Sequence, residues 1–178
     1  MPANWPFSLA DLTAGLRRYY GDTGLSVEAH EEIRLEDRRP SVGSVRGLRA
    51  EVRTGGERRT IELVVKEPQG ATRAGLAGVG RREAGVYQSL AQQLPVATPR
   101  LVAADSMGGW LILEHVPAGV APAQWTAEDY LSAIRALALL HERFWDLGED
   151  LGYYPWLGRP QFSDFEIHVM AAASAMEK

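Results

Sequence analysis

Apolar residues recur every three or four positions in several stretches of the chain, and this spacing predicts amphipathic helices. The predicted helices span residues 8–20, 74–94, 127–145 and 162–176. The first has the clearest limits, because Ser8 and Asp11 have the spacing of an N-cap followed by an acid in the first turn. Gly21 is placed where this helix should end.

Shorter apolar and β-branched runs lie between the first three helices and predict five strands. These strands are residues 33–35, 48–52, 60–65, 101–103 and 109–113. The pair Gly55–Gly56 is a turn signal, so residues 27–66 are predicted to form a three-stranded antiparallel meander. The order of elements predicts an α+β fold: a five-stranded antiparallel sheet with one packed helix, preceded by a helix and followed by a helical region.

Composition then narrows the class of protein. Apolar residues make up 46% of the 178 residues, which is enough for a packed core. The net charge of −4 argues against a nucleic-acid-binding protein, which usually carries a basic excess. The lack of cysteine excludes disulfides, thiolate catalysis and zinc–cysteine sites. The chain has no apolar run of about 18 residues and no signal-like start, so we expect a cytoplasmic protein without a membrane span.

The strand 60–65 is followed directly by a cation. Strand alternation places Lys66 on the same face as Val64, so a positive charge lies beside an apolar wall. Such a pair suits the phosphates and the adenine of a nucleotide. On the strand alone, the simpler interpretation is a solvated lysine at a strand end.

Glu83 favours the functional interpretation of Lys66. It lies on the apolar face of the predicted helix 74–94, where a carboxylate needs a cationic partner to offset its desolvation. Lys66 is a candidate partner from the preceding strand. The alternative is that Glu83 lies at the edge of the apolar face and pairs with Arg81, Arg82 or solvent.

Five motifs in sequence order resemble one family. They are Leu-Val-Val-Lys ending at Lys66, Arg-Arg-Glu-Ala-Gly-Val-Tyr around Glu83, Thr-Pro-Arg-Leu from Thr98, Leu-Ile-Leu-Glu-His-Val-Pro-Ala-Gly from Leu111 and Leu-Ala-Leu-Leu-His-Glu-Arg-Phe-Trp from Leu137. The set is similar to the aminoglycoside phosphotransferase and choline-kinase-like family, over roughly residues 12–156. The resemblance implies a kinase-like small lobe at residues 1–116. Residues 117–178 would be the hinge or linker and the start of a helical C-terminal lobe.

The resemblance also implies a function. The family uses magnesium and transfers the γ-phosphoryl group of ATP to a hydroxyl of a small molecule. Lys66, held by Glu83, would contact the ATP phosphates. At the hinge, the backbone carbonyl of Glu114 and the amide of Val116 would pair with the adenine edge, and Leu113 would close the back of the pocket.

The loop that would cover the phosphates departs from the kinase pattern. Residues 38–47 contain neither Gly-x-Gly-x-x-Gly nor a Walker A sequence. The backbone amides of Gly43, Ser44 and Gly47 are candidates for phosphate contacts, because glycine and turn backbone can approach an anion closely. An ordinary hairpin turn with surface arginines explains the same residues equally well.

The family's catalytic loop is not found in the sequence. It reads His-x-Asp with an asparagine five residues later, whereas the only asparagine here is Asn4. Two strings imitate the catalytic and metal motifs, one ending at Asp146 and one starting at Asp164, but neither is followed by the residue that the motif requires. His141 is instead expected to pack within its helix. We therefore expect no catalytic or metal-binding residues in this chain, and a chain that stops before the catalytic loop.

Three interpretations stay open at this point. The chain is the ATP-binding portion of a phosphotransferase and inactive by itself, or a non-catalytic nucleotide-binding or protein-interaction module, or an α+β protein without a nucleotide site. ATP is the expected ligand, and magnesium is expected only in a complete enzyme. The acceptor is open among antibiotics, choline-like alcohols, sugars and amino-acid hydroxyls. Apolar helix faces, for example around Phe144 and Trp145, are expected to favour self-association.

Overall fold

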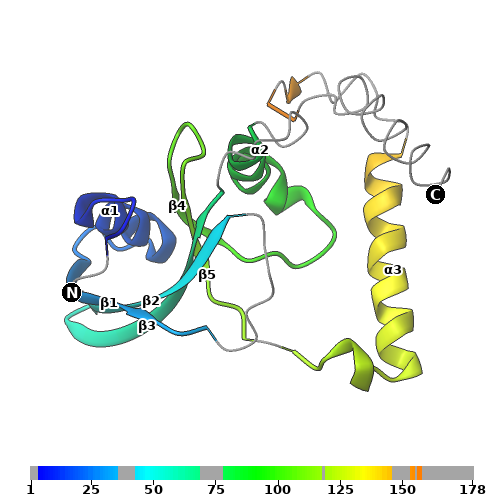
Figure 1. The fold of residues 1–178 in the computed structure, drawn as a ribbon, viewed down its shortest axis with the longest axis horizontal. Helices are drawn as coiled ribbons and strands as arrows, with labels where there is room; N and C mark the ends of the chain where they lie inside the picture. Colours follow the sequence, from blue (N-terminus) through cyan, green and yellow to red (C-terminus); the bar gives the residue numbers. More distant parts are fainter. Residues whose placement is uncertain are drawn as a thin grey trace, which may run out of the picture.

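The protein has an α+β fold built on one open antiparallel sheet (Figure 1). The computed structural model describes residues 4–35, 43–68, 78–117, 119–145, 153–154 and 156–157. Its elements are α1 (Leu9–Tyr20), β1 (Ser26–Ile33), β2 (Ser44–Thr54), β3 (Glu57–Glu67), α2 (Val79–Gly85), β4 (Leu101–Ala104), β5 (Leu111–Glu114) and α3 (Ala127–Phe144). Two irregular turns, Val86–Leu90 and Ala91–Gln93, continue α2, and a third, Pro122–Gln124, precedes α3.

The five strands are ordered β1-β2-β3-β5-β4, and every neighbouring pair is antiparallel. The predicted meander is confirmed, and its second and third strands are joined at Gly55–Gly56, where both glycines have positive φ. Such a two-residue turn with positive φ matches the twist of a hairpin.

The position of the first strand was predicted wrongly. Pairing with β2 extends over Ser26–Ile33, so β1 ends where residues 33–35 were expected to begin a strand. The sequence of β1 is mostly polar because this is an edge strand whose side chains are largely exposed. It is held by its backbone ladder to β2 rather than by an apolar face, and that leaves little hydrophobic pattern to detect.

Helix α1 covers one face of the sheet, which we call the core face. Its buried residues Leu12 and Leu16 belong to the main apolar cluster. The sheet contributes buried side chains from four strands to this cluster: Leu48, Ala50, Val52, Leu63, Val65, Val102, Ala103 and Ile112. The helix has the limits predicted for it, with Ser8 and Asp11 forming a capping box and Gly21 ending it in a left-handed conformation.

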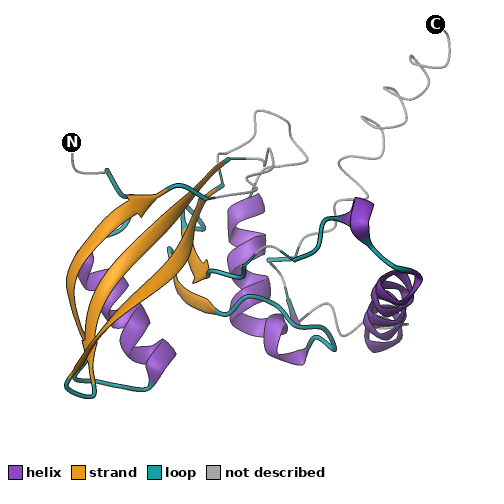
Figure 2. Cartoon of the chain, turned by 90° about the horizontal axis from the view of Figure 1, so that it is seen from below, coloured by secondary structure: helices purple, strands orange, loops and turns teal. Residues whose placement is uncertain are grey.

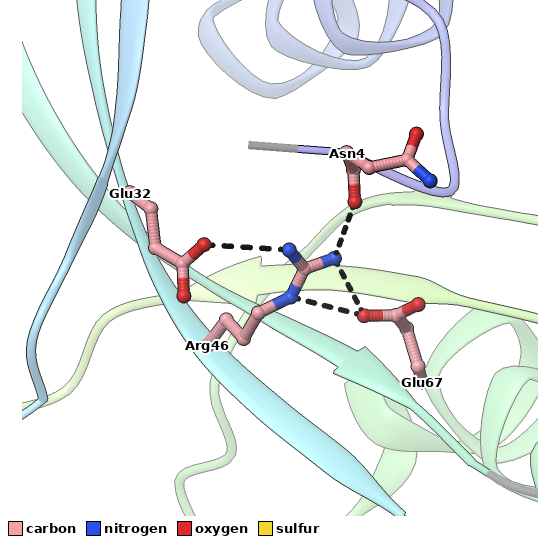
Figure 3. A network of polar contacts seen from close by, with 4 residues as sticks. All are labelled: Asn4, Glu32, Arg46 and Glu67. Atoms are coloured by element: carbon pink, nitrogen blue, oxygen red, sulfur yellow. Dashed lines mark hydrogen bonds and ion pairs between the residues drawn. The ribbon is translucent and has the colours of Figure 1, made fainter. Parts of the chain in front are cut away.

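Arg46 fastens the N-terminal segment to the same sheet (Figure 3). Its guanidinium group donates to Glu67 at 2.7 Å, to the backbone carbonyl of Asn4 at 3.1 Å and, more weakly, to Glu32 at 3.4 Å. The guanidinium carbon also lies 4.2 Å from the centre of the Trp5 ring. One arginine therefore ties three strands and the segment before α1 together.

The predicted second helix is present but changes its hydrogen bonding along its length. Regular α-helix spans Val79–Gly85, a π-helical turn follows at Val86–Leu90, and a 3₁₀ turn at Ala91–Gln93 ends before Pro95. The predicted start, residues 74–77, lies outside the described residues. A π-helical turn rotates the side chains that follow it relative to a regular helix.

Helix α3 agrees with its predicted span to within one residue, and Thr126 and Asp129 form its capping box. It stands apart from the sheet in both views (Figures 1 and 2) and buries no residue. The expectation that His141 packs within the fold is therefore wrong, because its side chain is exposed. The fourth predicted helix, residues 162–176, lies outside the described part of the chain. Among the described residues, no helix combines the length and apolar character required to cross a bilayer.

Candidate functional site

The sheet face opposite α1 carries three of the residues singled out from the sequence, Val64, Lys66 and Leu113. Directly paired residues of antiparallel strands point to the same side of the sheet. The registers place Val64 between Gly47 and Leu113, and Lys66 between Val45 and Leu111. These six residues define what we call the Lys66 face, and their neighbours Leu63 and Val65 point into the core.

The Lys66 face is apolar on both sides of the lysine. Leu111 and Leu113 are almost fully buried, and Val64 is partly exposed. Ile33 and Leu35 lie over Gly47, where an added Cβ would come within 2.7 Å of the Ile33 side chain. Ile33 pairs with Gly47 across β1 and β2, so glycine at position 47 makes room for Ile33 and Leu35, and this candidate for phosphate contact lies within β2.

Lys66 and Glu83 form an ion pair between β3 and α2, with Nζ in contact with Oε1. The contact expected from strand alternation and helical phase is thus present. The two side chains keep 28% and 25% of their surface exposed, so the pair is in contact with solvent. Partial exposure lowers the desolvation cost of both charges and leaves the ammonium group accessible to a ligand.

Two glycines let α2 approach closely enough for this pair. At Gly80 an added Cβ would collide with the backbone carbonyl of Gly108, in the turn between β4 and β5. At Gly85 it would collide with the ring of Trp156. The helix is therefore seated by backbone contacts on one side and by an aromatic ring on the other.

Tyr87, one turn after Glu83, was not singled out from the sequence. Burial raises the pKa of its hydroxyl, and the nearby Glu83 carboxylate raises it further. Both effects disfavour the phenolate form, because burial and a neighbouring negative charge each penalise a second anion. The available signal was its spacing of four residues from Glu83 on the same helical face.

The predicted hinge follows β5. The amide of Glu114 donates to the carbonyl of Arg100 at 2.9 Å, and Leu113 lies in the row of Val64. His115 Nδ1 lies 3.5 Å from Glu62 Oε2. Val116 is 56% exposed, and its amide has no acceptor in the part of the chain that the structure describes. The backbone of Val116 is therefore available to a ligand.

The candidate phosphate loop is described only at its end. Gly43 has φ of 98°, and Ser44 begins β2 opposite Glu67, one position beyond the pair of Val45 with Lys66. The amides of Gly43 and Ser44 are thus next to the Lys66 end of the sheet. Residues 38–42 of this loop lie outside the described residues.

The structure separates Asn4 from the Lys66 face. Its carbonyl is bound by Arg46, whose side chain is on the core side together with that of Glu67. Asp146 and Asp164 lie outside the described residues. Within the described ranges, no group of three or more His, Asp or Glu side chains is arranged to hold a metal ion.

Neither protein-family models nor curated proteins nor solved structures gave a match to this chain. The resemblance to aminoglycoside phosphotransferases and choline kinases therefore stays a prediction, which rests on the motifs described above. The structure places Lys66 on β3, Glu83 on α2 and Leu111–Glu114 on β5, whereas the motif from Leu137 lies in α3, apart from the sheet.

Proposed function

We propose that this domain binds ATP on the Lys66 face and is the ATP-binding portion of a phosphotransferase that acts on a hydroxyl of a small molecule. The observation that carries the proposal is the ion pair of Lys66 with Glu83, beside the apolar row of Val64 and Leu113. A cation that is held by a carboxylate yet keeps solvent contact suits a phosphate ligand.

The residues present fit the two ends of a nucleotide. Val64 offers a partly exposed apolar contact for the adenine ring, and the buried Leu113 closes the row behind it. The carbonyl of Glu114 and the amide of Val116 supply an acceptor and a donor for the edge of the base. The phosphates would lie toward Lys66 and the amides of Gly43 and Ser44.

A second candidate is a non-catalytic nucleotide-binding or protein-interaction module built on the same lobe. It is favoured because Asn4, the only asparagine of the sequence, lies on the core side and not on the Lys66 face.

Magnesium in a complete enzyme would neutralise charge on the phosphates. We expect no acceptor-dependent turnover of ATP by this chain, and loss of any observed turnover in Asp146→Ala or Asp164→Ala would favour catalysis by these residues.

Titration with adenosine and ATP, followed by the amide resonances of Glu114 and Val116, tests the proposal. We expect both amides to shift, with a dissociation constant of about 1 mM, because only part of a kinase site is present. Lys66→Ala should weaken ATP binding more than adenosine binding, since the ammonium group faces only the phosphates. If neither amide moves at saturating ligand while the protein stays folded, the interpretation without a nucleotide site is correct.

A further inference from the structure

The side chain of Glu114 faces away from the proposed nucleotide. Glu114 pairs with Leu63 across β3 and β5, and Leu63 points into the core. The Glu114 carboxylate is therefore on the side of α1, while its backbone carbonyl belongs to the hinge. A side chain in this position cannot contact adenine, so its contribution to a nucleotide site would have to be indirect.

Arg100, just before β4, holds Glu114 by two reciprocal backbone contacts. The Arg100 amide donates to Oε2 of Glu114 at 3.1 Å, and the Glu114 amide donates to the Arg100 carbonyl at 2.9 Å. The first of these involves a carboxylate, and charge-assisted hydrogen bonds are stronger than neutral ones. Together they fix both the backbone and the side chain of Glu114.

Arg100 in turn joins the hinge to the end of α1. Its guanidinium carbon lies 4.1 Å from the centre of the Tyr19 ring, and Nη2 donates to the Tyr19 carbonyl at 3.1 Å. Carbonyls in the last turn of a helix lack an intrahelical donor, and a cation there is favourable. Tyr19 itself packs against the main apolar cluster, so the connection ends in the core.

The electrostatics of Tyr19 agree with this arrangement. Burial raises the pKa of the Tyr19 hydroxyl, the charge of Glu114 raises it further, and Arg100 opposes the shift. All three groups are thus close enough to act on one another. By contrast, within the described residues the His115 side chain makes one polar contact, to the exposed Glu62.

We infer that Glu114 and Arg100 are positioning residues, which hold the hinge backbone in the orientation that adenine requires. The inference rests on the proposed nucleotide site. Glu114 is the last residue of β5, so fixing its backbone also fixes the direction in which the chain continues to Val116. A hinge that is already ordered loses less conformational entropy on binding, which is the general benefit of preorganisation.

Glu114→Ala tests the inference, because it removes the carboxylate and leaves the backbone carbonyl in place. We expect adenosine and ATP to bind about tenfold more weakly, by the same factor, since a hydrogen bond to a charged group is removed. Glu114→Gln should recover most of the affinity, because its amide oxygen still accepts from the Arg100 amide. Arg100→Ala should lower nucleotide affinity less than Glu114→Ala does, since the backbone of residue 100 keeps its contacts with Glu114.

Asp22→Ala is the matched control. Asp22 also lies at the end of α1 and accepts from the Thr54 hydroxyl and the Gly55 amide, but it has no contact with Glu114. It should lower stability without changing adenosine affinity. Equal adenosine affinity of wild type and Glu114→Ala would overturn the positioning role while leaving the nucleotide site intact.

If the wild type binds no nucleotide, the proposed function is refuted. A second readout then still tests whether Glu114 orders the hinge backbone. Backbone order parameters of His115 and Val116 in the free protein should fall in Glu114→Ala and stay unchanged in Asp22→Ala. Unchanged order parameters in Glu114→Ala would refute the positioning role whether or not nucleotide binds.

Discussion

Lys66 is chemically distinctive in this chain, because Lys178 is the only other lysine and all remaining members of the Lys and Arg count are arginines. An ammonium group is a compact charge on a flexible stem, whereas a guanidinium group is a planar fork. The arginines described above use this planar group: Arg46 bridges Glu67 and Asn4, and Arg100 stacks on the ring of Tyr19. Lys66 stands where a single charge contacts one carboxylate oxygen.

This scarcity of lysine permits a selective labelling experiment. An adenosine with a 5′ sulfonyl fluoride should form a sulfonamide with Lys66, as the amine displaces fluoride. We expect modification at Lys66 that excess ATP suppresses, because the label and ATP compete for the same face. Peptide mass spectrometry locates the label, and Lys178 provides the internal control. ATP-insensitive labelling, equal at both lysines, would count against nucleotide binding at Lys66.

Asp22 is a carboxylate that accepts hydrogen bonds from the turn between β2 and β3. The hydrogen bond from Thr54 is the first cause that lowers the pKa of its carboxyl group, followed by those from the amides of Gly24 and Gly55. Because the folded-state pKa lies below the unfolded value, the stabilisation is present above pH 3.8 and is lost as the pH falls through the folded-state pKa. Asp22→Asn should therefore show a smaller loss of stability on acidification than wild type.

Urea denaturation at neutral pH and near pH 3 measures this difference for both proteins. Ser8 and Asp11 form a capping box elsewhere on α1, so Asp11→Asn provides a comparison at the opposite end of the same helix. If wild type and Asp22→Asn lose equal stability, the contacts of the Asp22 carboxylate do not contribute in the way inferred.

At the scale of elements, turn chemistry predicted the hairpin of β2 and β3, on which part of the site is built. A two-residue turn at Gly55–Gly56 pairs Thr54 with Glu57, and the register that follows necessarily places Gly47 opposite Val64. The helical phase likewise placed Glu83 toward the sheet. By contrast, the first strand was predicted at the wrong position because β1 is a polar edge strand. The role of Arg100 was not predicted because its partner Tyr19 is distant in sequence.

Gly80 is predicted to determine the distance between α2 and the sheet. A Cβ at this position would collide with the Gly108 carbonyl, and backbone atoms on both sides leave little room for relaxation. Gly80→Ala should displace α2, separate Glu83 from Lys66 and destabilise the protein by about 1–3 kcal/mol. The measurements are urea denaturation and ATP titration.

Gly119→Ala is the matched control for Gly80→Ala, because an added Cβ at Gly119 meets no atom within 4 Å. It should leave both stability and ATP affinity close to wild type. Wild-type ATP affinity in a folded Gly80→Ala protein would mean that close seating of α2 is not needed for the site.

At the scale of the molecule, the fold consists of a well-packed sheet region and the helix α3, which makes few contacts with that region. Most core residues come from α1 and four strands, whereas no residue of α3 is buried. Among the described residues, the hydrogen bond from Arg143 to Gln93 at 3.1 Å joins α3 to the turn that follows α2. The apolar stripe of α3 was predicted from the sequence, but its exposure depends on what lies beside the helix, which periodicity does not encode.

The exposed stripe predicts self-association of the purified domain. Leu131, Ile134 and Leu137 are 51%, 61% and 52% exposed and lie on one side of α3. Burying such side chains between two molecules removes apolar surface from water, with each fully buried aliphatic residue contributing about 1.5–3 kcal/mol.

The double variant Ile134→Glu and Leu137→Glu should therefore be more monomeric than wild type in sedimentation experiments across a concentration series. Ser132→Glu, an exposed polar position of the same helix, should behave as wild type. A wild type that sediments as a monomer at every concentration would show that this stripe does not drive association.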